Sequence, residues 1–278
     1  MKAKSFITCG ALAAGMLLNG CVPFHVVKGD GDLVTREINV GDYSEIEASL
    51  SSNMEINYTQ SGEATELSVL TDRNILEKYD IRVEGQTLKI LPKEEYMYRA
   101  RVKTTQYNAM FLPTKFIVTT ASKGLRIIDT AGGVNFTVDN ALHTDELKIS
   151  AAGSAKINFR DTLTADNIRV SVAGSGTLNA SALEARSFEG EIAGSGRMNM
   201  GGHVEKLSFE IAGSGKIRAF DLQAEDVEVE IAGSGNIEIS VNNSISAEIA
   251  GSGSIKYKGD PSHINKDVMG SGTIKKVD

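Results

Sequence analysis

The chain has little of several residue types that often define a protein's class. Its 278 residues include no Trp, 4 Pro and 2 Cys, and aromatic residues make up 6%. Two cysteines are too few for a disulfide framework, and so few aromatics leave core packing to aliphatic side chains. The net charge of −7 gives no overall basic surface, which excludes nucleic acid and anionic lipid as expected partners.

The N-terminus has the features of a bacterial lipoprotein leader. Lys2 and Lys4 precede an apolar stretch over 6–18, which is too short for a membrane span but typical of a signal peptide. The sequence Leu-Asn-Gly-Cys over 18–21 resembles a lipobox. We therefore expect residues 1–20 to be removed, and Cys21 to be acylated (palmitate) and to anchor the protein in a membrane through a tether over 21–32. The alternative is an ordinary secretory signal that leaves Cys21 as a free thiol.

Glycine, with 28 residues, is abundant, and it follows a repeat. An Ala-Gly-Ser-Gly motif recurs every 18 to 21 residues through the second half of the chain. Glycine suits a tight corner because it tolerates positive φ and a close approach of the neighbouring backbone. The glycines predicted to form structural turns are Gly153, Gly174, Gly176, Gly194, Gly196, Gly213, Gly215, Gly233, Gly235, Gly251, Gly253, Gly270 and Gly272.

Apolar and polar residues alternate on both sides of this motif, as in Val-Glu-Val-Glu-Ile over 227–231. This period of two predicts strands, and helical periodicity is absent. The repeats therefore predict an all-β fold, a β-helix or solenoid with rungs of about 20 residues and a glycine corner in each. We expect one domain over 33–278, with irregular N-terminal rungs over 33–130, a helical turn over 74–79 and regular repeats over 131–278.

Two outward columns follow from the repeat. An amide ladder is predicted for Asn158, Asn179 and Asn199. An acidic column is predicted for Glu191, Glu210, Glu230, Glu248 and Asp267. Carboxylates at rung spacing are suited to a divalent cation, but no known calcium motif accompanies them. We favour a solvated edge relieved by Lys206, Lys216 and Arg218, and we predict no metal.

One basic segment, over 93–115, stands out in this acidic chain. Tyrosines alternate there with basic residues, a combination that can stack on sugar rings and pair with acidic groups. The candidate ligand-binding residues are Tyr96, Tyr98, Arg99, Arg101, Lys103 and Tyr107. The alternative is a protruding hairpin whose tyrosines lie on the solenoid wall.

Catalysis is not expected. His143, His203 and His263 are each separated by 60 residues, or three rungs, so they lie about 14 Å apart at strand spacing. No catalytic or nucleotide-binding motif is present, and we predict no catalytic residue and no cofactor.

Several segments resemble the autotransporter-adhesin head GIN domain family. They are the lipobox, the stretches over 43–49, 54–56 and 83–90, and the glycine repeat. The resemblance implies a right-handed β-helix, similar in shape to pectate lyases, on a lipoprotein of a diderm bacterium and assigned to adhesion. It implies no catalytic residues.

We therefore expect a non-enzymatic lipoprotein of the cell envelope, anchored in the outer membrane, that acts as an adhesin or binds a glycan or another surface protein. A structural spacer without a ligand is the first alternative, and a polysaccharide-acting β-helix enzyme is the less favoured one. The side of the outer membrane that the protein faces and its assembly into a homo-oligomer stay open.

Overall fold

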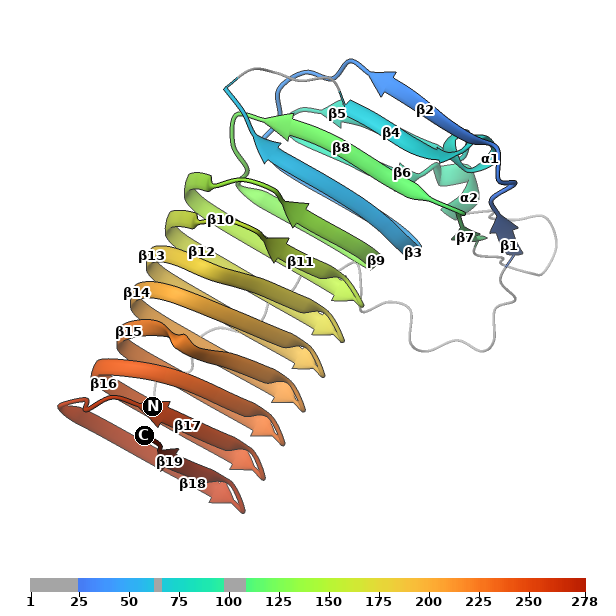
Figure 1. Ribbon diagram of the computed structural model, residues 1–278. Coiled ribbons are helices and arrows are strands. Elements are labelled where there is room, and N and C mark those ends of the chain that lie inside the picture. Colours follow the sequence, from blue (N-terminus) through green and yellow to red (C-terminus); the bar gives the residue numbers. More distant parts are fainter. Residues whose placement is uncertain (1–24, 63–66, 98–108) are drawn as a thin grey trace.

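The computed structural model describes residues 25–62, 67–97 and 109–278. They form a β-solenoid of about 8 turns, with 76% of the described residues in strands and 3% in helices (Figure 1). The solenoid predicted from the repeats is therefore confirmed. Within the described residues, none of the helices is long and apolar enough to cross a membrane.

The regular part of the solenoid is a ladder of parallel strands. Its strands are β9 (Ile127–Val138), β10 (Leu142–Gly153), β11 (Lys156–Phe159), β12 (Leu163–Gly174), β13 (Thr177–Gly194), β14 (Arg197–Gly213), β15 (Lys216–Gly233), β16 (Asn236–Gly251), β17 (Ser254–Lys258), β18 (His263–Gly270) and β19 (Thr273–Lys276). Successive rungs pair in register at the corner, so that Gly194, Gly213 and Gly233 lie side by side. Equivalent residues of the repeats consequently form columns along the solenoid.

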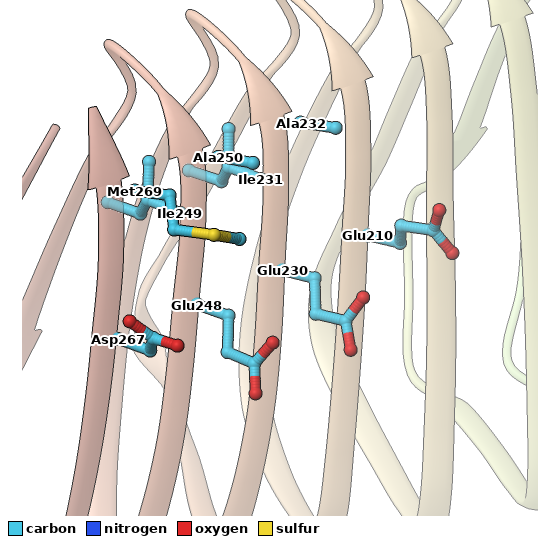
Figure 2. A pocket seen from close by; sticks show the side chains of 9 residues that line it. All are labelled: Glu210, Glu230, Ile231, Ala232, Glu248, Ile249, Ala250, Asp267 and Met269. Atoms are coloured by element: carbon cyan, nitrogen blue, oxygen red, sulfur yellow. The ribbon is translucent and has the colours of Figure 1, made fainter. Parts of the chain in front are cut away.

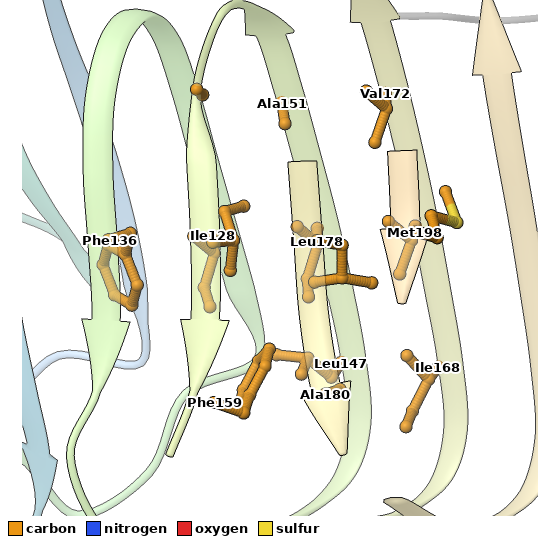
Figure 3. Close-up of a cluster of buried hydrophobic side chains, with 14 of the residues drawn as sticks. Ile128, Phe136, Leu147, Ala151, Phe159, Ile168, Val172, Leu178, Ala180 and Met198 are labelled. Atoms are coloured by element: carbon orange, nitrogen blue, oxygen red, sulfur yellow. The ribbon is translucent and has the colours of Figure 1, made fainter. Parts of the chain in front are cut away.

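The alternation of side chains separates the core from the surface. In β15, Val227, Val229 and Ile231 are buried, whereas Glu228 and Glu230 are exposed. Figure 3 shows inward side chains of successive rungs meeting inside the solenoid. Each rung covers the apolar row of the previous one, so that burial accumulates with every repeat.

The two glycines of each corner meet different steric requirements. The first has a positive φ, for example +128° at Gly213, where an added Cβ would lie 2.6 Å from the carbonyl oxygen of Gly194. The second lies outside that φ region, but a Cβ at Gly215 would approach Cγ2 of Ile192 to 2.7 Å. The first glycine, such as Gly213, is therefore required by its backbone conformation and by the close neighbouring rung. The second, such as Gly215, is required because a side chain there would overlap the core.

The N-terminal part has a mixed topology. Its elements are β1 (His25–Lys28), β2 (Leu33–Ile38), β3 (Glu45–Gln60), β4 (Leu67–Asp72), α1 (Arg73–Leu76), β5 (Tyr79–Glu84), β6 (Thr87–Pro92), α2 (Glu94–Met97), β7 (Ala109–Leu112) and β8 (Phe116–Ser122). Strand β3 pairs in parallel with β6, β8 and β9, which continues the ladder. The pairs β2–β4, β4–β8 and β5–β6 are antiparallel. This region is therefore a folded cap on the first rungs (Figure 1), and we call residues 25–62, 67–97 and 109–126 the cap.

A buried carboxylate connects the segments of the cap. Asp72 Oδ1 accepts a hydrogen bond from the Gly31 amide at 2.9 Å, and its Oδ2 accepts one from the Thr114 amide at 2.7 Å. Strand β1, which falls within the segment expected to be a tether, pairs in parallel with β7. The segment over 25–31 is therefore part of the folded cap.

The last rung is more exposed than those before it. The side chains of Ile264, Val268 and Met269 are 51%, 39% and 66% exposed. Lys266 occupies the column of the buried Ala247, where its Nζ donates a hydrogen bond of 3.0 Å to the hydroxyl of Tyr257. A charged group thus stands in an otherwise apolar inward column at this end of the ladder.

Candidate functional site

Each glycine corner joins two outer walls of the solenoid. The long-strand wall consists of the outward residues in the segments that precede the corners, such as Glu228 and Glu230 of β15. The short-strand wall consists of the outward residues in the segments that follow them, such as Lys216 and Arg218. In-register pairing turns each outward position into a column, so both walls present long, regular arrays of polar groups.

The short-strand wall has two columns, one for each outward position of the short segment. The first column contains Asn135, Lys156, Thr177, Arg197, Lys216, Asn236, Ser254 and Thr273. The second contains Thr137, Asn158, Asn179, Asn199, Arg218, Glu238, Lys256 and Lys275. Within the ladder strands the first column includes no acidic residue and the second includes one, so this part of the wall is basic; Glu55 of the cap is the next register neighbour of Asn135.

The amide ladder lies on the same wall. Asn158 donates through Nδ2 to Oδ1 of Asn135 at 3.0 Å, Asn179 to Asn158 at 2.8 Å, and Asn199 to Asn179 at 2.7 Å. The ladder predicted from the sequence therefore forms and is one residue longer than predicted. Its amides are held in one orientation along the solenoid.

The acidic column lies on the long-strand wall. Glu191, Glu210, Glu230, Glu248 and Asp267 are register neighbours. Figure 2 shows four of these carboxylates in a row, beside a recess of about 100 Å³ whose other lining residues include Ala232 and Ala250. Among the described residues, no group of three or more His, Cys, Asp or Glu side chains has a geometry suited to a metal ion.

The carboxylates of this column disfavour one another's charge. Burial, followed by the charge of Glu210, raises the pKa of Glu191. Burial, followed by the charges of Glu248 and Glu210, raises the pKa of Glu230. No Lys or Arg side chain of the described residues lies within 4.0 Å of these two carboxylates. The expected relief by Lys216 and Arg218 is wrong, because both residues face outward on the short-strand wall.

A broad groove of about 930 Å³ crosses the long-strand wall. Its lining residues include Phe188, Leu207, Val227 and Ile245, whose side chains are buried in the core. Its polar rim includes Ser187, Ser208, Ser246, Asp226 and Lys206. The groove spans several rungs, which suits an extended partner more than a small compact one.

Most of the candidate ligand-binding segment lies outside the described residues. This applies to Tyr98, Arg99, Arg101, Lys103 and Tyr107, and also to Cys21. Tyr96 is described: it is half-buried, and its ring makes an edge-on contact with Phe111 at a centroid distance of 6.0 Å. The Nζ of Lys78 lies 4.9 Å from the same ring. Tyr96 thus packs on the cap wall.

The histidines do not converge. His143 and His203 occupy one column with Thr164 and Glu184 between them, and His263 belongs to another column, next to Ser244. Three rung spacings of about 4.8 Å separate His143 from His203. Shared metal binding or shared catalysis by these side chains is incompatible with that distance.

The basic wall is the feature that sequence reasoning missed. Its signal is present in the sequence: the residue that directly follows the second glycine of each corner is repeatedly basic or neutral, as at Arg197 and Lys216. The acidic column alone predicts that Lys216 and Arg218 lie near its carboxylates, whereas the structure places both residues on the other side of the corner. The columns have to be traced on both sides of the corner before their charges can be compared.

The fold and its walls define a β-solenoid module with long polar surfaces. The family model described as "Putative auto-transporter adhesin, head GIN domain" matches residues 42–160 and 148–261. The chain belongs to this family. No curated protein matches its sequence.

Solved structures from Parabacteroides are similar to this chain over 91% of its length. A protein of Parabacteroides distasonis described as a putative lipid binding protein is 36% identical, with a TM-score of 0.84 over 100% of that chain. A putative adhesin from Parabacteroides merdae is 28% identical, with a TM-score of 0.80 over 99% of its chain. Another putative adhesin from P. distasonis is 30% identical, with a TM-score of 0.79 over 100% of its chain. The comparisons therefore place this chain in an adhesin-like family of the cell surface or envelope.

Proposed function

We propose that this protein is a non-enzymatic lipoprotein of the bacterial outer membrane, anchored through acylated Cys21, that binds a glycan or another surface protein. The observation that carries the proposal is the pair of long walls, on which in-register columns repeat the same polar chemistry from rung to rung. Such walls suit an extended, repetitive partner. The family and the two relatives described as adhesins support the same reading.

A non-enzymatic role is supported by the arrangement of the titratable groups. The raised pKa values of Glu191 and Glu230 arise on an outer wall from burial and like-charged neighbours, and each carboxylate belongs to a uniform column. A glycosidase would need two carboxylates in different environments on either side of a bound sugar. The acidic column instead places like-charged carboxylates at one register position of successive rungs.

The first experiment is protease shaving of intact cells that express the full chain, with detection of the remaining protein by antibody. Adhesion requires loss of the signal while a periplasmic marker stays intact. Protection until the outer membrane is permeabilised would contradict the adhesin and favour the structural spacer. A Cys21→Ala variant tests the anchor, because it should move the protein from the membrane fraction to the soluble fraction.

The basic segment over 93–115 is the second part of the proposal. A variant with Arg99→Gln, Arg101→Gln and Lys103→Gln leaves the packed Tyr96 in place, so that the cap keeps its contact with Phe111. If this segment contacts the ligand, the variant should bind glycan-array spots recognised by the wild type about tenfold more weakly. Unchanged binding would remove the segment from the site.

A further inference from the structure

We infer that the short-strand wall binds a linear acidic polysaccharide, whose chain runs along the solenoid with its carboxylates over the Lys and Arg side chains. The inference rests on the proposed function and specifies the class of ligand. It starts from a contrast within the molecule, which is acidic overall with a net charge of −7. One wall nevertheless concentrates the opposite charge.

The cations of this wall are numerous and exposed. They are Lys156, Arg197, Lys216, Arg218, Lys256 and Lys275. Glu238 is the one acidic residue in the two columns, and its Oε1 lies 3.6 Å from Nζ of Lys256. The opposite sign prevails on the long-strand wall, where each of the last five rungs contributes one carboxylate to the acidic column. The separation of charge thus follows the glycine corner.

Most of these cations have no carboxylate partner. Of the six, only Lys256 has a carboxylate within 4.0 Å among the described residues. On the long-strand wall, by contrast, Arg169 pairs with Glu189 at 2.8 Å and Arg186 with Asp166 at 3.1 Å. The short-strand cations are therefore available to a ligand.

The same cations also repel one another. Arg197 is the register neighbour of Lys216, and Lys256 that of Lys275. Like charges that face each other on adjacent strands destabilise a sheet. A polyanion lying over these columns would remove that repulsion, and binding would stabilise the ladder as well as hold the ligand.

The spacing suits a sugar polymer. From Lys156 to Lys275 the first and second columns cross six rung spacings of about 4.8 Å, or about 29 Å in total. One rung spacing is comparable to the length of one sugar in an extended polysaccharide. A uronic acid chain would therefore place about one carboxylate on each rung.

The neutral groups of the wall complete the match. The oriented amides of Asn158, Asn179 and Asn199 can hydrogen-bond to sugar hydroxyls. None of the sixteen residues in the two columns is aromatic, so the columns have no platform for stacking on neutral sugar rings. The half-buried ring of Phe220, two residues after Arg218, already has Nζ of Lys258 at 5.3 Å from its centroid. Charge and hydrogen bonding, not stacking, would therefore select the ligand.

The test is binding of the full chain, in detergent, to immobilised polygalacturonate, with neutral dextran as the reference surface. The decisive variant combines Arg197→Gln, Lys216→Gln and Arg218→Gln. All three side chains are exposed, so the fold should survive, and circular dichroism checks this. The matched control removes the same charge outside the short-strand wall and outside the groove, by Lys123→Gln, Lys148→Gln and Arg186→Gln, at three exposed positions.

We expect the wild type to bind polygalacturonate but not dextran, and binding to weaken as salt is raised. The short-strand variant should bind about tenfold more weakly, as three exposed charge contacts imply, and the control should bind like the wild type. Equal losses in both variants would overturn the inference. Equal binding of a DNA oligonucleotide would also overturn it, because it would indicate unselective binding of polyanions. So would a change in oligomeric state in the short-strand variant alone, which would indicate a second copy of the chain on this wall.

Failure of this inference is distinguishable from failure of the proposed function. If the wild type ignores polygalacturonate but still binds other glycans or cell surfaces, the acidic ligand is wrong and adhesion stands. If it binds none of these surfaces, both are wrong.

Discussion

The cap and the ladder reach a stable fold by different means. The cap combines parallel and antiparallel pairs and depends on single buried groups, such as Asp72 and the hydrogen bond of 2.6 Å between Tyr43 Oη and Thr120 Oγ1. The ladder repeats one rung, and its hydrogen bonds and apolar contacts recur in every turn. A substitution in the cap should therefore destabilise only the segments that contact the substituted residue. A bulky substitution in the ladder should also disturb the stacking of the neighbouring rungs, because each rung packs on the next.

The largest effect is expected from Gly213→Val in the ladder. The added side chain would have to adopt a φ of +128° and would meet the Gly194 carbonyl oxygen at 2.6 Å from its Cβ. Backbone strain and overpacking together should lower the free energy of unfolding by about 4 kcal/mol. Urea unfolding followed by circular dichroism measures the change.

The adjacent Ser214→Ala substitution is the matched control. The Ser214 side chain is exposed, and the backbone N–H of this residue makes the rung contact, to the Gly194 carbonyl oxygen at 2.8 Å. Its replacement should change the free energy of unfolding by less than about 0.5 kcal/mol. Similar values for the two variants would refute the steric role of the corner.

A smaller and more local effect is expected from Asp72→Ala in the cap. The substitution leaves the Gly31 and Thr114 amides without their acceptor, which should cost about 2 to 3 kcal/mol. Hydrogen exchange should increase over 25–32 and 112–115, while the rungs over 197–258 keep their protection. Asp42→Ala, at an exposed position of the cap, is the control. Loss of protection throughout the ladder would mean that cap and ladder unfold as one unit.

The same residue predicts the acid behaviour of the cap. Burial would raise the pKa of Asp72, but hydrogen bonds from Thr114 and from the Gly31 amide outweigh it, and the pKa lies below its ordinary value of 3.8. Because the folded pKa is lowered, this stabilisation is present above pH 3.8 and is lost as pH falls through the folded pKa. In acid titrations, the difference in unfolding free energy between wild type and Asp72→Ala should therefore shrink at low pH.

The ladder could be predicted from the sequence more completely than the cap, because its sequence motif repeats and the pairs of the cap do not. The ladder, its glycine corners and the amide ladder of Asn158, Asn179 and Asn199 could be predicted because eight repeats average out local ambiguity. The antiparallel pairs of the cap could not, because each occurs once and depends on long-range packing. The helical turn expected over 74–79 is found at Arg73–Leu76, and Tyr79 begins β5 instead.

The candidate site could likewise be predicted only in part. The acidic column could be predicted from its period, but its environment could not, because the side of the corner on which Lys216 and Arg218 lie is a property of three-dimensional register. Tyr96 is a second example. Its position among basic residues predicts a ligand contact, and the structure adds what the sequence does not give, the packing of its half-buried ring against Phe111.

The smallest effect is expected from a substitution in the acidic column, where the repeat places like-charged carboxylates on adjacent rungs and so lowers the stability of the ladder. Burial and the charges of Glu248, Glu210 and Glu228 raise the pKa of Glu230, so that its ionised form is disfavoured in the folded state. Glu230→Gln should therefore stabilise the protein at pH 7, by about 0.5 kcal/mol for a solvent-screened contact. Because the folded pKa is raised, the wild type regains this stability as pH falls through it, and the melting temperatures of wild type and variant should converge towards pH 4. Glu205→Gln, an exposed position outside the column, is the control. A variant less stable than the wild type at pH 7 would contradict the destabilising effect of the like charges.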